Sequence, residues 1–239
     1  MAGPVAHIVI ALQMFNNGLL SAREPEDLVR LIVGTSFPDI RYTTKLSRKT
    51  THPGTATLQQ IRQERNPFKA GMDLHDLVDR VRWYYIHKHK VLDMLPQHPR
   101  TSLCLKLFEG QLLRNQVEDW ATVHRFFNHI TPEERTFNLP EKKIKEWHEL
   151  IQYFCSSSPP NAQKLASLYF MIQFQSKFFK LPAKLRNLMA TLLAKLPLPI
   201  FLKTRRFMKT LGQNEHLKQT ILYFYDNFLQ IAQEYEASL

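Results

Sequence analysis

Apolar residues recur at helical spacing from one end of this 239-residue chain to the other, and this pattern limits the folds open to it. It runs through residues 4–17 near the start and through 213–236 near the end, where apolar side chains return every three or four positions. We find no convincing alternation of apolar and polar residues of the kind that a half-buried strand shows. Glycine is scarce, with 7 residues, whereas a sheet protein of this length needs many glycine-bearing turns. The sequence therefore predicts an all-α fold, a compact multi-helix domain.

Proline and glycine positions divide this pattern into separate elements. Pro25 lies near the first turn of the second expected helix, and Gly34 marks its expected end. The stretch from Gly34 to Tyr42 is expected to be a loop, in which apolar neighbours hold Asp39 in place. Over the first two thirds of the chain, helices are expected at 4–17, 21–33, 55–65, 72–95, 101–130 and 140–156, with a basic surface loop at 43–51.

One interruption is long enough to bound a domain. It is the Ser-Ser-Ser-Pro-Pro run at 156–160. We nevertheless expect a single domain over residues 1–239, because the last helix has enough apolar surface to pack back on the rest. The part at about 1–155 carries the candidate site described below, and the part at about 161–239 is basic and rich in aromatic residues.

The composition restricts the class of protein. Hydrophobic residues make up 44% of the chain, enough for a core, which argues against a wholly disordered protein. No apolar run approaches the roughly 20 residues of a membrane-spanning helix. The N-terminus lacks the basic start of a secretory signal, and Cys104 and Cys155 are too few for a disulfide framework. We expect a cytoplasmic or peripheral membrane protein with no transmembrane segment and no classical signal peptide; export by another route stays open.

The formal net charge of +11 favours an anionic partner. No acidic residue lies between Glu149 and Glu215, whereas ten lysines and arginines lie from Lys164 to Lys209, interleaved with phenylalanines. Such a mixture suits an acidic membrane surface or a nucleic-acid backbone, and a solvated basic face over core aromatics explains it equally well. The expected partners are an anionic phosphodiester substrate, an acidic membrane surface and, with less support, nucleic acid.

A second feature carries the chemistry. His75 and Asp79 lie four positions apart in an expected helix, so both side chains project from one face, one turn apart. Upstream lie His7 in an apolar helix, Asp39 in Phe-Pro-Asp-Ile, and His52 in Thr-His-Pro. Each of these residues has an ordinary structural explanation when it is considered alone. Imidazole nitrogens and carboxylate oxygens together suit zinc or a similar divalent ion, so the set predicts a metal site.

The order of these residues resembles that of a known family. After the early His come Pro-Asp-Ile, then Thr-His, then Phe-x-x-Gly-x-x-x-His-x-x-x-Asp. Over about residues 3–90 this order resembles the zinc-dependent phospholipase C family, to which fungal single-strand nucleases are related. The resemblance implies an all-helical fold, with Asp39, His75 and Asp79 as catalytic residues. It implies these ligands: Asp39, His52, His75 and Asp79 at one zinc ion, and His7 with Asp79 at a second.

A second resemblance is to acyl-carrier-protein phosphodiesterase, through Ala6-His7, the Gly34 to Asp39 loop and the Gly71 to Asp79 helix. Both resemblances imply a metal-dependent hydrolase that cleaves phosphodiester bonds, in phospholipid or another substrate, with a metal-bound hydroxide as the nucleophile. We expect one or two divalent ions, zinc first among the candidates. The alternative is a non-catalytic basic helical module that binds anionic membranes or nucleic acid. The roles of six residues stay open: His87, His89, Glu118, Asp119, His129 and Glu133.

Overall fold

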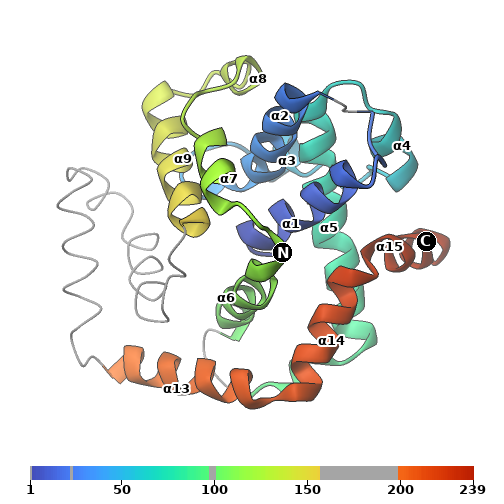
Figure 1. Ribbon diagram of the computed structural model, residues 1–239, viewed down its shortest axis with the longest axis vertical. Helices are drawn as coiled ribbons and strands as arrows, with labels where there is room; N and C mark the ends of the chain where they lie inside the picture. The colour runs from blue at the N-terminus through green and yellow to red at the C-terminus, as the bar shows by residue number, and fades with distance from the viewer. Residues whose placement is uncertain (1, 22–23, 97–100, 157–198) are drawn as a thin grey trace.

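The computed structural model describes residues 2–21, 24–96, 101–156 and 199–239 (Figure 1). Every regular element in that part is an α-helix or a short 3-10 helix, so the predicted all-α fold is confirmed. The elements are α1 (Pro4–Asn16), α2 (Pro25–Ser36), η1 (Phe37–Tyr42), α3 (Arg48–Thr51), α4 (Leu58–Gln63), α5 (Pro67–Lys88), η2 (Val91–Met94), α6 (Thr101–Leu113), η3 (Arg114–Gln116), α7 (Trp120–Phe126), α8 (Pro132–Arg135), α9 (Glu141–Cys155), α13 (Pro199–Gln213), α14 (Glu215–Asp226) and α15 (Phe228–Ala237).

Helix α1 is central to the N-terminal part of the fold. It is apolar on nearly all sides, and Ile8, Val9 and Ile10 are fully buried in succession. A helix of this kind must be covered all round. Helices α2, α5, α6 and α9 supply that cover. His7 is carried into the interior on this helix and is itself 1% exposed.

Helices α2 and α5 cross at close range, and two glycines allow it. A Cβ atom added to Gly34 would lie closer than 3.0 Å to the backbone oxygen of Phe68, and one added to Gly71 would lie equally close to the backbone oxygen of Leu31. The expected end of the second helix at Gly34 is therefore wrong. Helix α2 continues through Gly34 to Ser36, because this glycine serves the crossing and not a helix end.

Several other boundaries differ from those expected. The helix expected over 101–130 ends at Leu113, and a new helix starts at Trp120, whose N-cap Asp119 accepts a hydrogen bond from the N–H of Thr122. The helix expected over 213–236 is divided at Asn227 into α14 and α15. The expected loops at 34–42 and 43–51 contain the 3-10 helix η1 and the four-residue helix α3, whose N-cap is Ser47.

The C-terminal helices pack back on the first part of the chain, α15 against α5 and both α13 and α14 against α6 (Figure 1). A buried ion pair adds to this packing: the Arg82 guanidinium on α5 donates to the Glu109 carboxylate on α6 at 2.7 Å. Tyr225 on α14 donates its hydroxyl to the same carboxylate at 3.2 Å. None of the helices in the described ranges is both long and apolar enough to cross a bilayer.

Candidate metal centre

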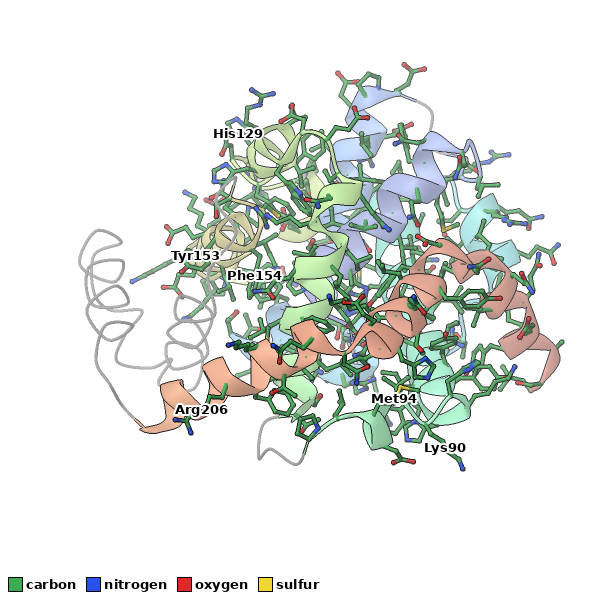
Figure 2. All side chains as sticks on the ribbon, turned by 60° about the horizontal axis from the view of Figure 1, so that its bottom comes forward. Lys90, Met94, His129, Tyr153, Phe154 and Arg206 are labelled. Carbon is green, nitrogen blue, oxygen red and sulfur yellow. The ribbon has the colours of Figure 1, made fainter. Side chains whose placement is uncertain are left out.

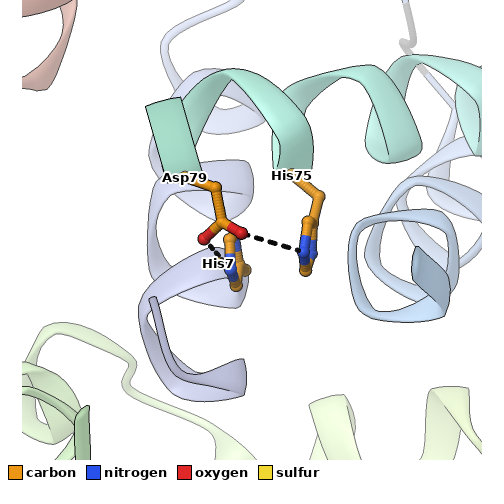
Figure 3. A group of neighbouring side chains, drawn as sticks. All are labelled: His7, His75 and Asp79. Atoms are coloured by element: carbon orange, nitrogen blue, oxygen red, sulfur yellow. Dashed lines mark ion pairs between the residues drawn. The ribbon is translucent and has the colours of Figure 1, made fainter. Parts of the chain in front are cut away.

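Five side chains from four segments meet in the interior, and we call them the cluster: His7, Asp39, His52, His75 and Asp79. Helix α5 brings His75 and Asp79, with Nε2 of His75 3.8 Å from Oδ2 of Asp79. Helix α1 places Nε2 of His7 3.4 Å from Oδ1 of Asp79 (Figure 3). Nε2 of His52, at the end of α3, lies 3.8 Å from Oδ2 of Asp79. In η1, Oδ1 of Asp39 lies 3.9 Å from Nε2 of His75.

The cluster is deeply buried, and several of its polar atoms lack partners. Every member is 7% exposed or less. No hydrogen-bond partner exists within the described part of the chain for Nδ1 and Nε2 of His7, for Nε2 of His52 and His75, or for Oδ1 of Asp39. A buried polar atom without a partner costs roughly 1–3 kcal/mol. Several of these unpartnered atoms face one another. A cation bound between them would supply the missing partners and remove this free-energy cost.

Neighbouring groups fix how two of the rings are turned. Nδ1 of His75 donates a hydrogen bond to the backbone oxygen of Thr35 at 2.8 Å, which directs its Nε2 at the cluster. Nδ1 of His52 is 2.9 Å from Oγ1 of Thr51, so that ring can carry its proton on the side away from the cluster. A hydrogen bond to one ring nitrogen is the usual way in which proteins orient a metal-binding histidine.

The rings pack closely on one another. The His7 and His75 rings are stacked, with centroids 3.7 Å apart and planes 9° from parallel. The His52 ring meets His75 edge-on at 5.0 Å. Two imidazolium ions at such a distance would repel each other strongly, so this packing disfavours positive charge on adjacent rings at the same time.

The protonation states fit metal ligands. Burial and the neighbouring His75 lower the pKa of His7 to about 3, and the same causes lower the pKa of His52 to about 3. Both rings are therefore neutral at physiological pH. Burial would raise the pKa of Asp79, but contact with His7 and the charge of His75 outweigh it and hold that pKa well below its usual range. Asp79 is then ionised, and its Oδ1 accepts a hydrogen bond from the backbone N–H of Ala2 at 2.5 Å.

The donor atoms form two overlapping groups. His7, His75 and Asp79 make one, and Asp39, His52 and His75 make the other; within each group the ligand atoms lie within 4.8 Å of one another. Three imidazoles and two carboxylates are a donor set that zinc accepts. These buried groups can hold a metal ion, and the sharing of His75 between them brings all five expected ligands to one place.

The residues whose roles were open lie elsewhere. His87 and His89 are exposed near the end of α5, and Glu118 is exposed before α7. Figure 2 shows His129 on the surface, where it is exposed. Two others have structural partners: Asp119 caps α7, and Glu133 pairs with Arg30. None of the six belongs to either donor group.

Most of the basic and aromatic segment falls outside the described residues. Within α13, Arg206 and Lys209 are exposed, and Figure 2 shows Arg206 on the outer side of that helix. Phe207 between them is 5% exposed and packs in the core. At this point the phenylalanine is a core residue between exposed cations.

Sequence reasoning missed a set of cations around the cluster. Burial raises the pKa of Asp39, and the positive charges of Lys106 and Arg41 act against that rise. After burial and His75, the charges of Arg48 and Arg41 also lower the pKa of His52. Arg41 follows Asp39 by two residues, which was a local signal. Lys106 lies in α6, beside Gly3, and only the fold brings it near.

Comparison of the chain with protein-family models, with curated proteins and with solved structures found no match.

Proposed function

We propose that the cluster binds one or two divalent cations, zinc foremost, and that the protein hydrolyses phosphodiesters at this centre. One observation carries the proposal. The buried and unpartnered Nε2 atoms of His7, His52 and His75 converge on the carboxylates of Asp39 and Asp79. An arrangement made only for stability would place partners opposite these atoms, because buried polar groups are normally hydrogen-bonded.

The cluster residues divide the work of such a site. The imidazoles of His7, His52 and His75 would supply nitrogen donors, and ionised Asp79 supplies negative charge next to all three of them. A bound divalent cation would lower the pKa of a water molecule and neutralise charge on phosphoryl oxygens. Asp39, at 7% exposed, is the most accessible member, and it lies in η1 two residues before Arg41.

The surroundings of Asp39 favour an anionic substrate. Arg41 and Lys106 act electrostatically on its carboxyl, and Arg48 acts on the neighbouring His52. Next to Arg41, Tyr42 is 39% exposed and accepts a hydrogen bond from the Arg41 guanidinium at 2.7 Å. Cations beside a metal centre can hold a phosphoryl group and stabilise the charge that develops on it during hydrolysis. This supports a phosphodiester over a neutral ester or amide.

The direct test is hydrolysis of a simple phosphodiester, bis(p-nitrophenyl) phosphate, by purified full-length protein. We expect activity that a chelator removes and that added Zn²⁺ or Mn²⁺ restores. The variant Asp79→Asn, which keeps the side-chain shape, should lose both bound metal and activity while its helical circular dichroism is unchanged. The matched control is Asp73→Asn, six residues earlier on α5, where the carboxylate pairs with Lys69.

Two results would contradict this function. If the metal-loaded protein cleaves no phosphodiester, phospholipid or carrier-protein substrate, the hydrolase proposal fails. A metal-free protein that binds anionic vesicles or nucleic acid would instead favour the non-catalytic basic module. Metal content that stays the same in Asp79→Asn would contradict the ligand assignment itself.

A further inference from the structure

His52 is the cluster member with the least regular support. It is the C-cap residue of the four-residue helix α3, and Pro53 and Gly54 follow it in a turn. The other histidines lie inside α1 and α5, whose length and packing hold them. A short helix before a turn does not by itself fix a side chain to within the tolerance that a metal site needs, since such sites depend on rigid support.

A buried carboxylate on α5 holds this turn. Asp76 is 2% exposed and follows His75 directly. Its Oδ2 accepts a hydrogen bond from the N–H of Gly54 at 3.0 Å and a second from Nε of Arg80 at 3.2 Å. The Arg80 guanidinium also donates to the backbone oxygen of Ala56. Asp76 and Arg80 thus clamp both ends of the 54–56 segment onto the helix that carries His75 and Asp79.

A third contact extends the clamp. The Glu236 carboxylate on α15 accepts a hydrogen bond from the N–H of Leu58, at the start of α4, at 2.6 Å. The Arg80 guanidinium lies 5.7 Å from the ring centre of Tyr235, which is also on α15. The chain that follows His52 is therefore tied to α5 and α15 at three successive points.

We propose that Asp76, with Arg80, is a positioning residue of the metal centre that sets where His52 stands relative to His75 and Asp79. This inference rests on the proposed metal site. Asp76 is turned to the clamp, and its negative charge is balanced by Arg80, so it acts through the backbone of Gly54 and not as a ligand. His75, Asp79 and Asp76 all lie on α5. The clamp therefore fixes the position of His52, which comes from another segment, relative to the two ligands on α5.

The consequence is measurable as metal affinity. Without the carboxylate, the N–H of Gly54 loses its partner and the turn can move, which takes Nε2 of His52 away from the other donors. Groups that orient a metal ligand typically contribute about 10–100-fold to affinity. We expect Asp76→Ala to weaken zinc binding by a factor in that range.

The experiment is zinc affinity, measured by competition with a chromophoric chelator, for full-length wild type, Asp76→Ala, His52→Ala and the double variant. If Asp76 acts through His52, the double variant binds zinc as His52→Ala does, with no further loss. Asp73→Ala, on the same helix but paired with Lys69, should bind zinc as wild type does. Hydrogen exchange at the Gly54 amide should accelerate in Asp76→Ala and stay slow in Asp73→Ala.

Further outcomes decide the matter. Wild-type zinc affinity in Asp76→Ala, or losses from Asp76→Ala and His52→Ala that multiply in the double variant, would overturn the positioning role and leave the proposed function intact. Zinc binding without phosphodiester hydrolysis would contradict the proposed function and leave the positioning role of Asp76 intact. A wild type that binds no zinc overturns both. If Asp76→Ala does not fold, Arg80→Ala serves: it removes the contact with the Ala56 backbone and the cation beside Asp76, so a smaller loss of zinc affinity is expected, and no loss contradicts the proposal.

Discussion

At the scale of single residues, the geometry of the cluster depends on which nitrogen of the His52 and His75 rings takes part in a hydrogen bond. Nδ1 of His75 is taken by a backbone oxygen and Nδ1 of His52 by a threonine hydroxyl. Both rings therefore present Nε2 to the interior. The backbone acceptor for His75 cannot be removed by mutation, but the side-chain partner of His52 can.

Replacing Thr51 by valine tests this directly. Thr51 is fully buried, and valine has nearly its shape. The change removes the hydroxyl that orients the His52 ring, so zinc affinity should fall by about 10-fold, at the lower end of the range for such partners. Thr50→Val is the control, because Thr50 is exposed and its hydroxyl contacts Ser47 instead. Equal affinities in the two variants, measured by chelator competition, would contradict the role of Thr51.

The lowered pKa values also predict how stability depends on pH. His7 and His52 titrate near pH 6.5 when unfolded and at about 3 when folded, so between these pH values the unfolded state binds more protons. Stability of the metal-free protein should therefore be full above about pH 6.5 and fall as the pH drops towards 3. Urea unfolding of chelator-treated protein should show a steeper loss in wild type than in the double variant His7→Gln/His52→Gln. Equal slopes would contradict the assignment of neutral buried rings.

At the scale of elements, the α2–α5 crossing places the cluster. It brings the backbone of Thr35 to His75 and sets η1, with Asp39, directly beyond the end of α2. Gly34 and Gly71 make the crossing close enough for this. Local sequence signals marked Gly34 as a helix end, because a glycine after an apolar run usually is one. Only the partner helix reveals its other purpose, and that partner is more than thirty residues away.

Substitution of either glycine should be costly. Gly34→Ala or Gly71→Ala drives a Cβ atom into backbone of the opposite helix, which cannot move aside as a side-chain end could. We expect each change to lower the free energy of unfolding by about 1–3 kcal/mol or more. Gly212→Ala in α13 is the control, because its added Cβ would meet no atom within 4 Å. Chemical denaturation that ranks Gly212→Ala as equally destabilising would contradict the close crossing.

Comparison of the expected helices with those of the structure shows which elements local sequence signals could predict. Local signals were sufficient to predict a helix end where a nearby residue itself ends the helix. Gly18 is an example: it has a positive φ of 63° and closes α1. They failed at residues 101–130, where a continuous apolar pattern hides a break made by the Asp119 cap and by the Trp120 indole, which donates to the Arg114 backbone oxygen at 2.8 Å. That hydrogen bond exists only once the chain has turned.

At the scale of the whole molecule, one buried ion pair joins three helices. Arg82 on α5 and Glu109 on α6 are each less than 5% exposed, and Tyr225 on α14 completes the network. Arg82 lies on the helix that carries His75 and Asp79, so the network ties α6 and α14 to the element that supplies two of the cluster residues.

Breaking this pair should weaken the entire fold. Glu109→Gln removes the negative charge that faces the buried Arg82 guanidinium, and we expect a loss of about 3–5 kcal/mol in the free energy of unfolding. Glu141→Gln, which breaks the exposed pair with Arg135, should change stability little. Thermal and urea denaturation of the two variants compare them directly. A Glu109→Gln protein as stable as the Glu141→Gln protein would contradict the structural role of the buried pair.

The order of histidines and aspartates along the chain was enough to name all five cluster residues, although each of them has an ordinary structural explanation when it is considered alone. What the order could not supply was their support. No local pattern distinguishes Asp76 from the other polar residues of α5, or Lys106 from the other lysines of the chain. Their positions beside the 54–56 segment and beside Gly3 depend on contacts between segments far apart in the sequence.

The central claim is that a cation sits among these five side chains. The most direct measurement is an anomalous difference map from crystals of the full-length protein grown with zinc and recorded at the zinc absorption edge. We predict a peak bounded by His7, Asp39, His52, His75 and Asp79, with ligand nitrogens at about 2.0–2.1 Å. A map with zinc elsewhere on the molecule, or with no peak among these residues, would contradict it.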